Sequence, residues 1–168
     1  WIAGFLLYSV GTVIVLQASV IFTIIIIGFL TPMILGILHK KYYSHLQLDG
    51  YGTITSSIWV LVKSSFIMIL LFIILIPVYF VPVLNIIAFS IPFYYFFHKL
   101  LNFDVSSTIL SAEQYKIIYG KEANNFRLRT LFLYFISMIP FATLFTAVYY
   151  IIYLGHAYFV KLDALQKS

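Results

Sequence analysis

The sequence has no cysteine, and charged residues make up only 9% of the chain. The first absence excludes disulfides, thiol redox chemistry and thiolate metal sites. The second is more informative, because a soluble domain carries roughly 25% charged residues, whereas 63% of this chain is apolar and 20% is aromatic. With a mean hydropathy of +1.06, most of the chain must have lipid as its solvent. We therefore predict an all-α integral membrane protein, with one membrane domain over 1–168.

Charge is absent from three long stretches. Trp1 to Leu38 contains no charged residue, 66–97 contains none in 32 residues, and 130–160 contains none in 31 residues. One helical crossing of the hydrocarbon core takes about 20 residues. The second and third stretches are therefore too long for one span and too short for two spans and a turn.

Prolines interrupt both the 66–97 stretch and the 130–160 stretch near the middle. Pro77 and Pro82 interrupt the first, and Pro140 interrupts the second. Proline removes a backbone donor and clashes with the preceding helical turn. We therefore expect a helix and a first hairpin over 55–103, and a second hairpin over 130–160. The hairpins should return to the side they entered, and the sequence leaves open whether they cross the bilayer or only dip into it.

The remaining segments are expected to lie between and before these hairpins. Residues 1–47 should form one long span, kinked at Pro32, that continues past the membrane surface. The stretch 105–129 is the only extended polar segment, and we expect a solvated connector with a helix start after Ser111 and a candidate end at Gly120. Because the sequence begins without an initiator Met, we expect an N-terminal segment upstream of it.

The charged residues predict how the chain sits in the membrane. Every Lys, Arg, Asp and Glu falls in 39–65, 98–129 or 161–168, and the proline bends have none. All charged segments should therefore share one face, and the positive-inside tendency makes that face cytoplasmic. The net charge of +5 is better explained by topology than by nucleic-acid binding, because no basic cluster interleaved with exposed aromatics lies outside the apolar segments.

Catalytic motifs are weakly represented. The five carboxylates all lie in polar segments, and no serine or histidine sits in a recognisable nucleophile motif. His39 and His45 are six residues apart, whereas a metal pair on a helix needs a spacing of three or four. His98 and His156 would meet only if the hairpins packed together. We therefore predict no enzymatic activity, no metal and no cofactor.

The hairpin bends offer a site for an anion. A helix that restarts near the membrane midplane presents unpaired backbone N–H groups and a positive dipole end. Asn85 follows Pro82 by three residues, and Thr143 follows Pro140 by three. Both side chains can donate hydrogen bonds, so two such ends facing each other would form a neutral anion site. The alternative is that both residues cap their own helices or bond the facing arm.

Basic residues flank the expected feet of the hairpins. They can collect anions at a cytoplasmic mouth, or serve only as interface anchors: Lys63, Lys99, Arg127 and Arg129. No Asp, Glu or Arg lies within the apolar segments, whereas ion-coupled carriers usually keep such residues at depth. A passive channel or uncoupled permease is therefore favoured over a coupled pump.

Three stretches together resemble the CysZ-type sulfate permeases and their etoposide-induced-protein-like relatives: FLTPMILGILHKKYYSHL, YFVPVLNIIAFSIPFYYFFHKLLNFD and RLRTLFLYFISMIPFATLF. The resemblance runs from about Gly11 to Phe159, and its specificity lies in the order and spacing of these pieces. It implies long membrane helices with two hairpins that penetrate part of the bilayer, in a homo-oligomer of a bacterial-type inner membrane. It also implies sulfate uptake that feeds cysteine biosynthesis.

One departure from the family limits what can be carried over. The family's glycine-and-arginine sulfate-binding motif precedes its first full span, and no residue of this sequence matches it. Asn85 matches the glutamine or asparagine that follows the family's first bend. The sequence thus predicts a permease or channel for sulfate or a similar oxyanion, and the alternative is a non-transporting scaffold or accessory subunit of a membrane complex.

Overall fold

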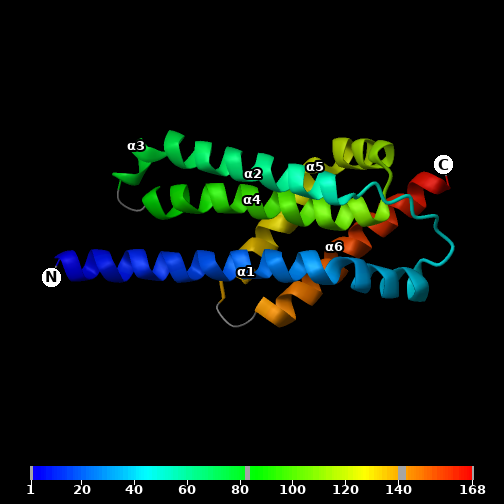
Figure 1. The fold of residues 1–168 in the computed structure, drawn as a ribbon, viewed down its shortest axis with the longest axis horizontal. Helices are drawn as coiled ribbons and strands as arrows, with labels where there is room; N and C mark the ends of the chain where they lie inside the picture. The colour runs from blue at the N-terminus through cyan, green and yellow to red at the C-terminus, as the bar shows by residue number, and fades with distance from the viewer. Residues whose placement is uncertain (1, 82–83, 140–142, 168) are drawn as a thin grey trace.

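The chain folds into helices in a computed structural model that describes residues 2–81, 84–139 and 143–167 (Figure 1). The side chains of 2–10, 13–14 and 143–144 lie outside this description. The described residues contain helices and no strand, which confirms the all-α prediction. The helices are α1 (Ile2–Tyr42), α2 (Ile54–Ile74), α3 (Ile76–Tyr79), α4 (Leu84–Ile109), α5 (Ala112–Ser137) and α6 (Thr143–Gln166).

Three of these helices are long and apolar enough to cross a membrane: α1 from Val15 onward, α2 and α4. α1 packs against α4, α5 and α6, and the buried core lies among these four helices. α2 packs only against α4 and α3, so its apolar surface is largely exposed, and Ser64 is its one buried residue. An exposed helix that is apolar on most sides is typical of a helix in lipid.

The first hairpin consists of α2, α3 and α4. Pro77 lies in the first turn of α3, where its missing N–H has no helical partner to lose, and Pro82 lies outside the described residues. Both arms extend beyond the uncharged stretch, because α2 already begins at Ile54 and α4 continues to Ile109. Each arm is therefore long enough to cross a membrane, although the uncharged stretch 66–97 alone is too short for two spans.

The second hairpin consists of α5 and α6, and Pro140 at its bend lies outside the described residues. The predicted helix start is confirmed, because the Ser111 side chain accepts a hydrogen bond from the Gln114 backbone N–H. The predicted end at Gly120 is wrong, because α5 continues through it to Ser137. A glycine inside a helix costs only about 1 kcal/mol, which neighbouring contacts offset. The stretch 105–129 thus contains the end of α4 and the first 18 of the 26 residues of α5.

The charged segments gather at one end of the molecule. The α1–α2 loop, the α4–α5 junction and the C-terminal end of α6 all lie at this end, and α3 lies at the other (Figure 1). In the same view the end of α5 and the start of α6 lie alongside the middle of α1. The second hairpin therefore reaches less far from the charged end than the first.

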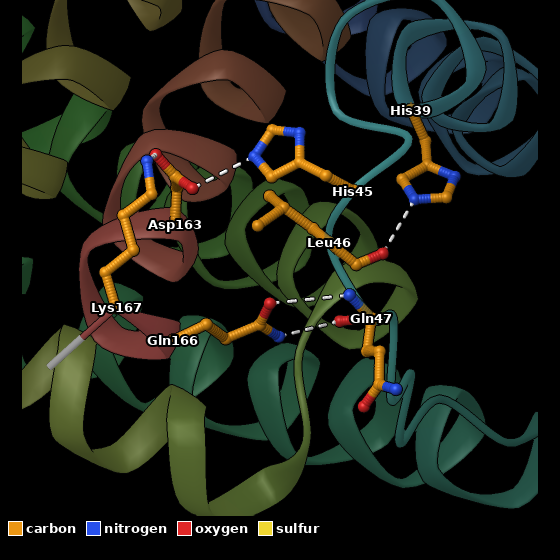
Figure 2. Close-up of polar contacts among 7 residues, drawn as sticks. All are labelled: His39, His45, Leu46, Gln47, Asp163, Gln166 and Lys167. Atoms are coloured by element: carbon orange, nitrogen blue, oxygen red, sulfur yellow. Dashed lines mark hydrogen bonds and ion pairs between the residues drawn. The ribbon is translucent and has the colours of Figure 1, made fainter.

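The loop between α1 and α2 is fixed to the C-terminal end of α6 (Figure 2). His45 Nε2 bonds the Asp163 carboxylate at 3.0 Å, and Gln166 Nε2 donates to the Gln47 carbonyl at 3.0 Å. Lys167 Nζ also donates to Asp163 at 2.7 Å. The first two bonds join segments that are 118 and 119 residues apart in the sequence.

Candidate functional site

Among the described residues, α3 at the bend of the first hairpin contacts neither helix of the second hairpin. Asn85 lies in the first turn of α4 with an exposed side chain, and its backbone N–H donates to the Val81 carbonyl at 3.1 Å. Thr143 begins α6, but its side chain lies outside the described residues. Among the described helices α3 contacts only α2 and α4. No contact between the two helix ends is present among the described residues, and the arrangement of two facing ends stays a prediction.

Three of the four predicted basic residues gather in one place. Lys63 comes from α2, Lys99 from α4 and Arg127 from α5, and Lys99 is close enough to the other two to be repelled by both. We call this set the basic triad. Within the described part of the chain, none of the three forms an ion pair. The triad is therefore a patch of unneutralised positive charge.

The helices explain why these three side chains converge. α2 and α4 pack side by side and run in opposite directions, so Lys63 in the first half of α2 and Lys99 in the second half of α4 lie near the same end. α5 turns back onto α4 after a two-residue junction. The Tyr94 hydroxyl of α4 donates to the Arg127 carbonyl at 2.9 Å, which fixes α5 beside the triad.

A buried polar network lies directly beside the triad. His98 Nδ1 lies 2.6 Å from Thr130 Oγ1, and Nε2 lies 2.8 Å from the Tyr119 hydroxyl. Asn102 Nδ2 donates to the His98 carbonyl at 2.8 Å, and the Tyr158 hydroxyl donates to Asn102 Oδ1 at 2.8 Å. These bonds join α4, α5 and α6 and satisfy polar groups that would be costly if buried alone.

The second histidine of the proposed pair belongs to a different contact. His156 Nδ1 lies 2.8 Å from the Tyr43 hydroxyl, and its ring packs against that of Tyr43. His98 and His156 therefore do not form a shared site. The described residues also contain no group of three or more His, Cys, Asp or Glu side chains that could hold a metal ion.

One carboxylate lies inside a helix that is long enough to cross a membrane, where the sequence predicted no carboxylate. Asp104 is half-buried within α4, a helix long enough to cross a membrane, and faces Gly28 of α1. It lines a cavity of about 240 Å³ together with Thr31 and Ser107. The uncharged stretch ends at residue 97, so composition alone predicts that Asp104 lies in water outside the membrane. The buried apolar residues around it, such as Leu101 and Val105, were the available signal that the helix continues.

Arg129 lies apart from the triad. It is two positions from Arg127 on a continuous helix, so the two side chains project about 200° apart. Arg129 instead lines a groove between α5 and α6. The sequence groups the two arginines because it predicts a connector over 105–129. In a segment without a helix, the spacing of two residues does not indicate on which side each side chain lies.

Comparison with known proteins identifies the family. Residues 1–147 match the family described as Sulfate transporter CysZ/Etoposide-induced protein 2.4. Comparison with curated proteins and with solved structures gives no match. The match covers more than half of the chain, so the protein belongs to this family, as the sequence predicted. It is therefore a membrane protein of a sulfate transporter family, and that family is one of transporters and not of enzymes.

Proposed function

We propose that the protein is an uncoupled permease or channel for sulfate or a similar oxyanion. The observation that carries this proposal is the basic triad, whose charges have no acidic partner in the described chain, in a member of a sulfate transporter family. We place it in a bacterial-type inner membrane with its charged end cytoplasmic, where it works as a homo-oligomer and supports cysteine biosynthesis.

The triad suits a dianion better than a monovalent one. Coulomb attraction scales with the charge of the ion, and at a partly buried position it is screened less than in water. Lys99 is half-buried, whereas Lys63 and Arg127 are exposed. The two exposed cations attract the anion from the cytoplasmic side, and Lys99 holds it beside the membrane. The guanidinium of Arg127 adds a planar pair of donors that fits two sulfate oxygens.

Passage across the membrane requires donors beyond the triad. Asn85 is 14 residues before Lys99 on α4, which places it about 21 Å away along the helix. Its exposed amide lies in the first turn of α4, at the far end of the first hairpin. Because α3 contacts neither α5 nor α6 among the described residues, we assign the second set of donors to a neighbouring subunit. The pathway therefore lies between subunits.

The test is sulfate uptake by the purified full-length protein in liposomes, with chloride and phosphate as competing anions. We expect saturable uptake that is selective for sulfate and that proceeds down the sulfate gradient without a pH gradient. Asp104→Asn should leave this uptake intact, because an uncoupled pathway needs no titrating carboxylate. Uptake that requires a pH gradient and is lost in Asp104→Asn would instead show a coupled carrier.

The scaffold alternative rests on the exposed apolar surface of α2, which a partner subunit could cover. No flux of any oxyanion, from protein that is folded and copurifies with another membrane complex, would favour that alternative.

A further inference from the structure

The groove between α5 and α6 combines a charged end with an apolar length. It has a volume of about 380 Å³ and opens to the surface of the molecule. Its polar side chains come from both helices: Asn125, Arg129, His156 and Lys161. The rest of its wall is aromatic and aliphatic, and includes Tyr149, Ile152 and Val160. Nothing in the sulfate pathway proposed above uses this groove.

Arg129 is held in place in this groove with donors to spare. Its Nε donates to Asn125 Oδ1 at 2.9 Å, and its guanidinium lies over the Tyr153 ring at 5.2 Å. Among the described contacts, the two terminal NH₂ groups have no hydrogen-bond partner. A guanidinium whose plane is fixed in this way binds two oxygens of a phosphate with little loss of side-chain entropy.

The groove has a surplus of positive charge. Lys161 is paired with Glu122, and this hydrogen bond is the largest cause of the lowered pKa of the Glu122 carboxyl. That pair is neutral, so the Arg129 charge remains without a full counter-ion. An anion is therefore the complementary ligand.

The apolar part of the groove indicates what kind of anion this is. Positions 149, 152, 153, 156 and 160 recur at helical spacing and form one stripe along α6. Tyr149, Ile152 and Val160 on this stripe are exposed in a chain that lies in lipid. A free oxyanion has nothing to bury against such a stripe, whereas an acyl chain does. Basic pockets between membrane helices at the cytoplasmic side are typical sites for anionic lipid headgroups.

We infer that this groove binds one anionic phospholipid, with its phosphate on Arg129 beside Tyr153 and an acyl chain along the deeper part of the stripe, at Tyr149 and Ile152. The polar end of the groove, at Asn125 and Lys161, then lies at the headgroup level. The deeper end lies among the chains, since α6 runs from the bend toward the charged end of the molecule (Figure 1). The inference depends on membrane insertion but not on sulfate transport.

The test is retention of phosphatidylglycerol by the purified full-length protein in detergent, measured by native mass spectrometry against phosphatidylcholine of the same chain length. We expect wild-type protein to retain phosphatidylglycerol preferentially, and Arg129→Gln to bind it about tenfold more weakly. Arg129→Lys should fall between the two, because it keeps the charge and loses the planar donors. Lys116→Gln, which removes one exposed positive charge from the same helix, is the matched control and should bind like wild type.

Three results would overturn the inference. They are equal retention of the two lipids by the wild type, unchanged phosphatidylglycerol binding in Arg129→Gln, and displacement of the lipid by inorganic phosphate at equal concentration. The last result would identify a site for a soluble anion. If Arg129→Gln does not fold, Tyr153→Leu keeps the charge but removes the supporting ring, and the inference predicts weaker binding in that variant also. The lipid-binding experiment does not measure sulfate flux, so failure of this inference is distinguishable from failure of the proposed transport.

Discussion

Arg127 and Arg129 differ by two positions in the sequence, yet they belong to different surfaces of α5. Arg127 joins Lys63 and Lys99, and Arg129 lines the groove with α6. The sequence identified the four basic residues as functional candidates, but it could not sort them. The two arginines separate only if 127–129 is helical, and the polar composition of this segment does not decide that.

The pair Glu122–Lys161 makes stability depend on pH. The hydrogen bond from Lys161, and then the one from Asn125, hold the pKa of Glu122 below its ordinary value. A carboxyl with a lowered folded-state pKa contributes stability above its unfolded pKa, and this contribution is lost as the pH falls through the folded pKa. Glu122→Gln should therefore show a smaller fall in Tm than wild type as the pH drops below about 4.3, the ordinary glutamate value.

Thermal melts in detergent at a series of pH values measure this effect. Glu113→Gln, which removes a carboxylate from the exposed first turn of the same helix, is the control and should keep the wild-type slope. Identical slopes for Glu122→Gln and wild type would show that the pair has no influence on stability.

The His98 network should contribute to stability beyond its packing. His98→Leu keeps an apolar side chain of moderate size, but it leaves Thr130 and Tyr119 without their bonds to the imidazole. The Thr130 hydroxyl keeps its bonds to the Phe126 and Arg127 carbonyls, so the cost is that of the two lost imidazole bonds, each worth about 0.5–1.5 kcal/mol. We therefore expect the unfolding free energy of His98→Leu to fall by about 1–3 kcal/mol. His45→Leu removes an exposed bond to Asp163 and should cost much less. Equal losses in the two variants would argue against the network.

At the scale of helices, α1 and α6 approach each other at a glycine. A Cβ added to Gly155 would lie 2.6 Å from Leu35 Cδ2 of α1, and Leu35 itself is buried. Small residues allow this kind of close helix packing in membranes. A Cβ added to Gly120 of α5 would meet nothing within 4 Å. The two glycines thus have different reasons for their presence.

Alanine at these two positions should have opposite effects. Gly120→Ala should raise the unfolding free energy by up to about 1 kcal/mol, because alanine has the higher helix propensity. Gly155→Ala gains the same propensity but must push Leu35 aside, and overpacking of this kind costs about 1–3 kcal/mol. Unfolding of both variants in a denaturing detergent series gives the comparison. Stabilisation by Gly155→Ala would show that the α1–α6 contact is looser than the structure describes.

The helices were partly predictable for identifiable reasons. The start of α5 follows from Ser111 and Gln114, because a capping box is a local signal. The start of α2 has a similar local signal, a capping box of Thr53 and Ser56. The end of α4 was not predictable from charge, since Lys99 and Asp104 are accommodated by contacts with α1, α2 and α5. Tertiary packing, which composition does not contain, decides where this helix ends.

At the scale of the whole molecule, the charged segments lie at one end and α3 at the other (Figure 1). The sequence predicted the shared end because every charged residue falls outside the proline bends. It did not predict that α3 contacts neither helix of the second hairpin among the described residues. That depends on the unequal reach of the two hairpins, and both have uncharged stretches of nearly the same length.

The shared end predicts a labelling pattern. Because the chain has no cysteine, single cysteines can be introduced without a background. Cysteines at Gln47, Lys121 and Lys167 should all be protected from a membrane-impermeant maleimide added outside cells, and all should react in inverted vesicles. These three positions come from the three charged segments and are all exposed. Labelling of any one of them from outside would contradict the placement of the charged end in the cytoplasm.

The role of the basic triad is tested most directly by the initial rate of sulfate uptake into liposomes by Lys99→Gln, beside wild type and Lys116→Gln. Both substitutions remove one positive charge, but only Lys99 lies in the triad. Loss of one charge-assisted interaction of about 1.5–3 kcal/mol corresponds to a change of roughly 10-fold or more. We predict at least that reduction in Lys99→Gln at low sulfate concentration, with wild-type uptake in Lys116→Gln. Equal sulfate uptake by all three proteins, each shown to be folded, would contradict a sulfate pathway through the triad.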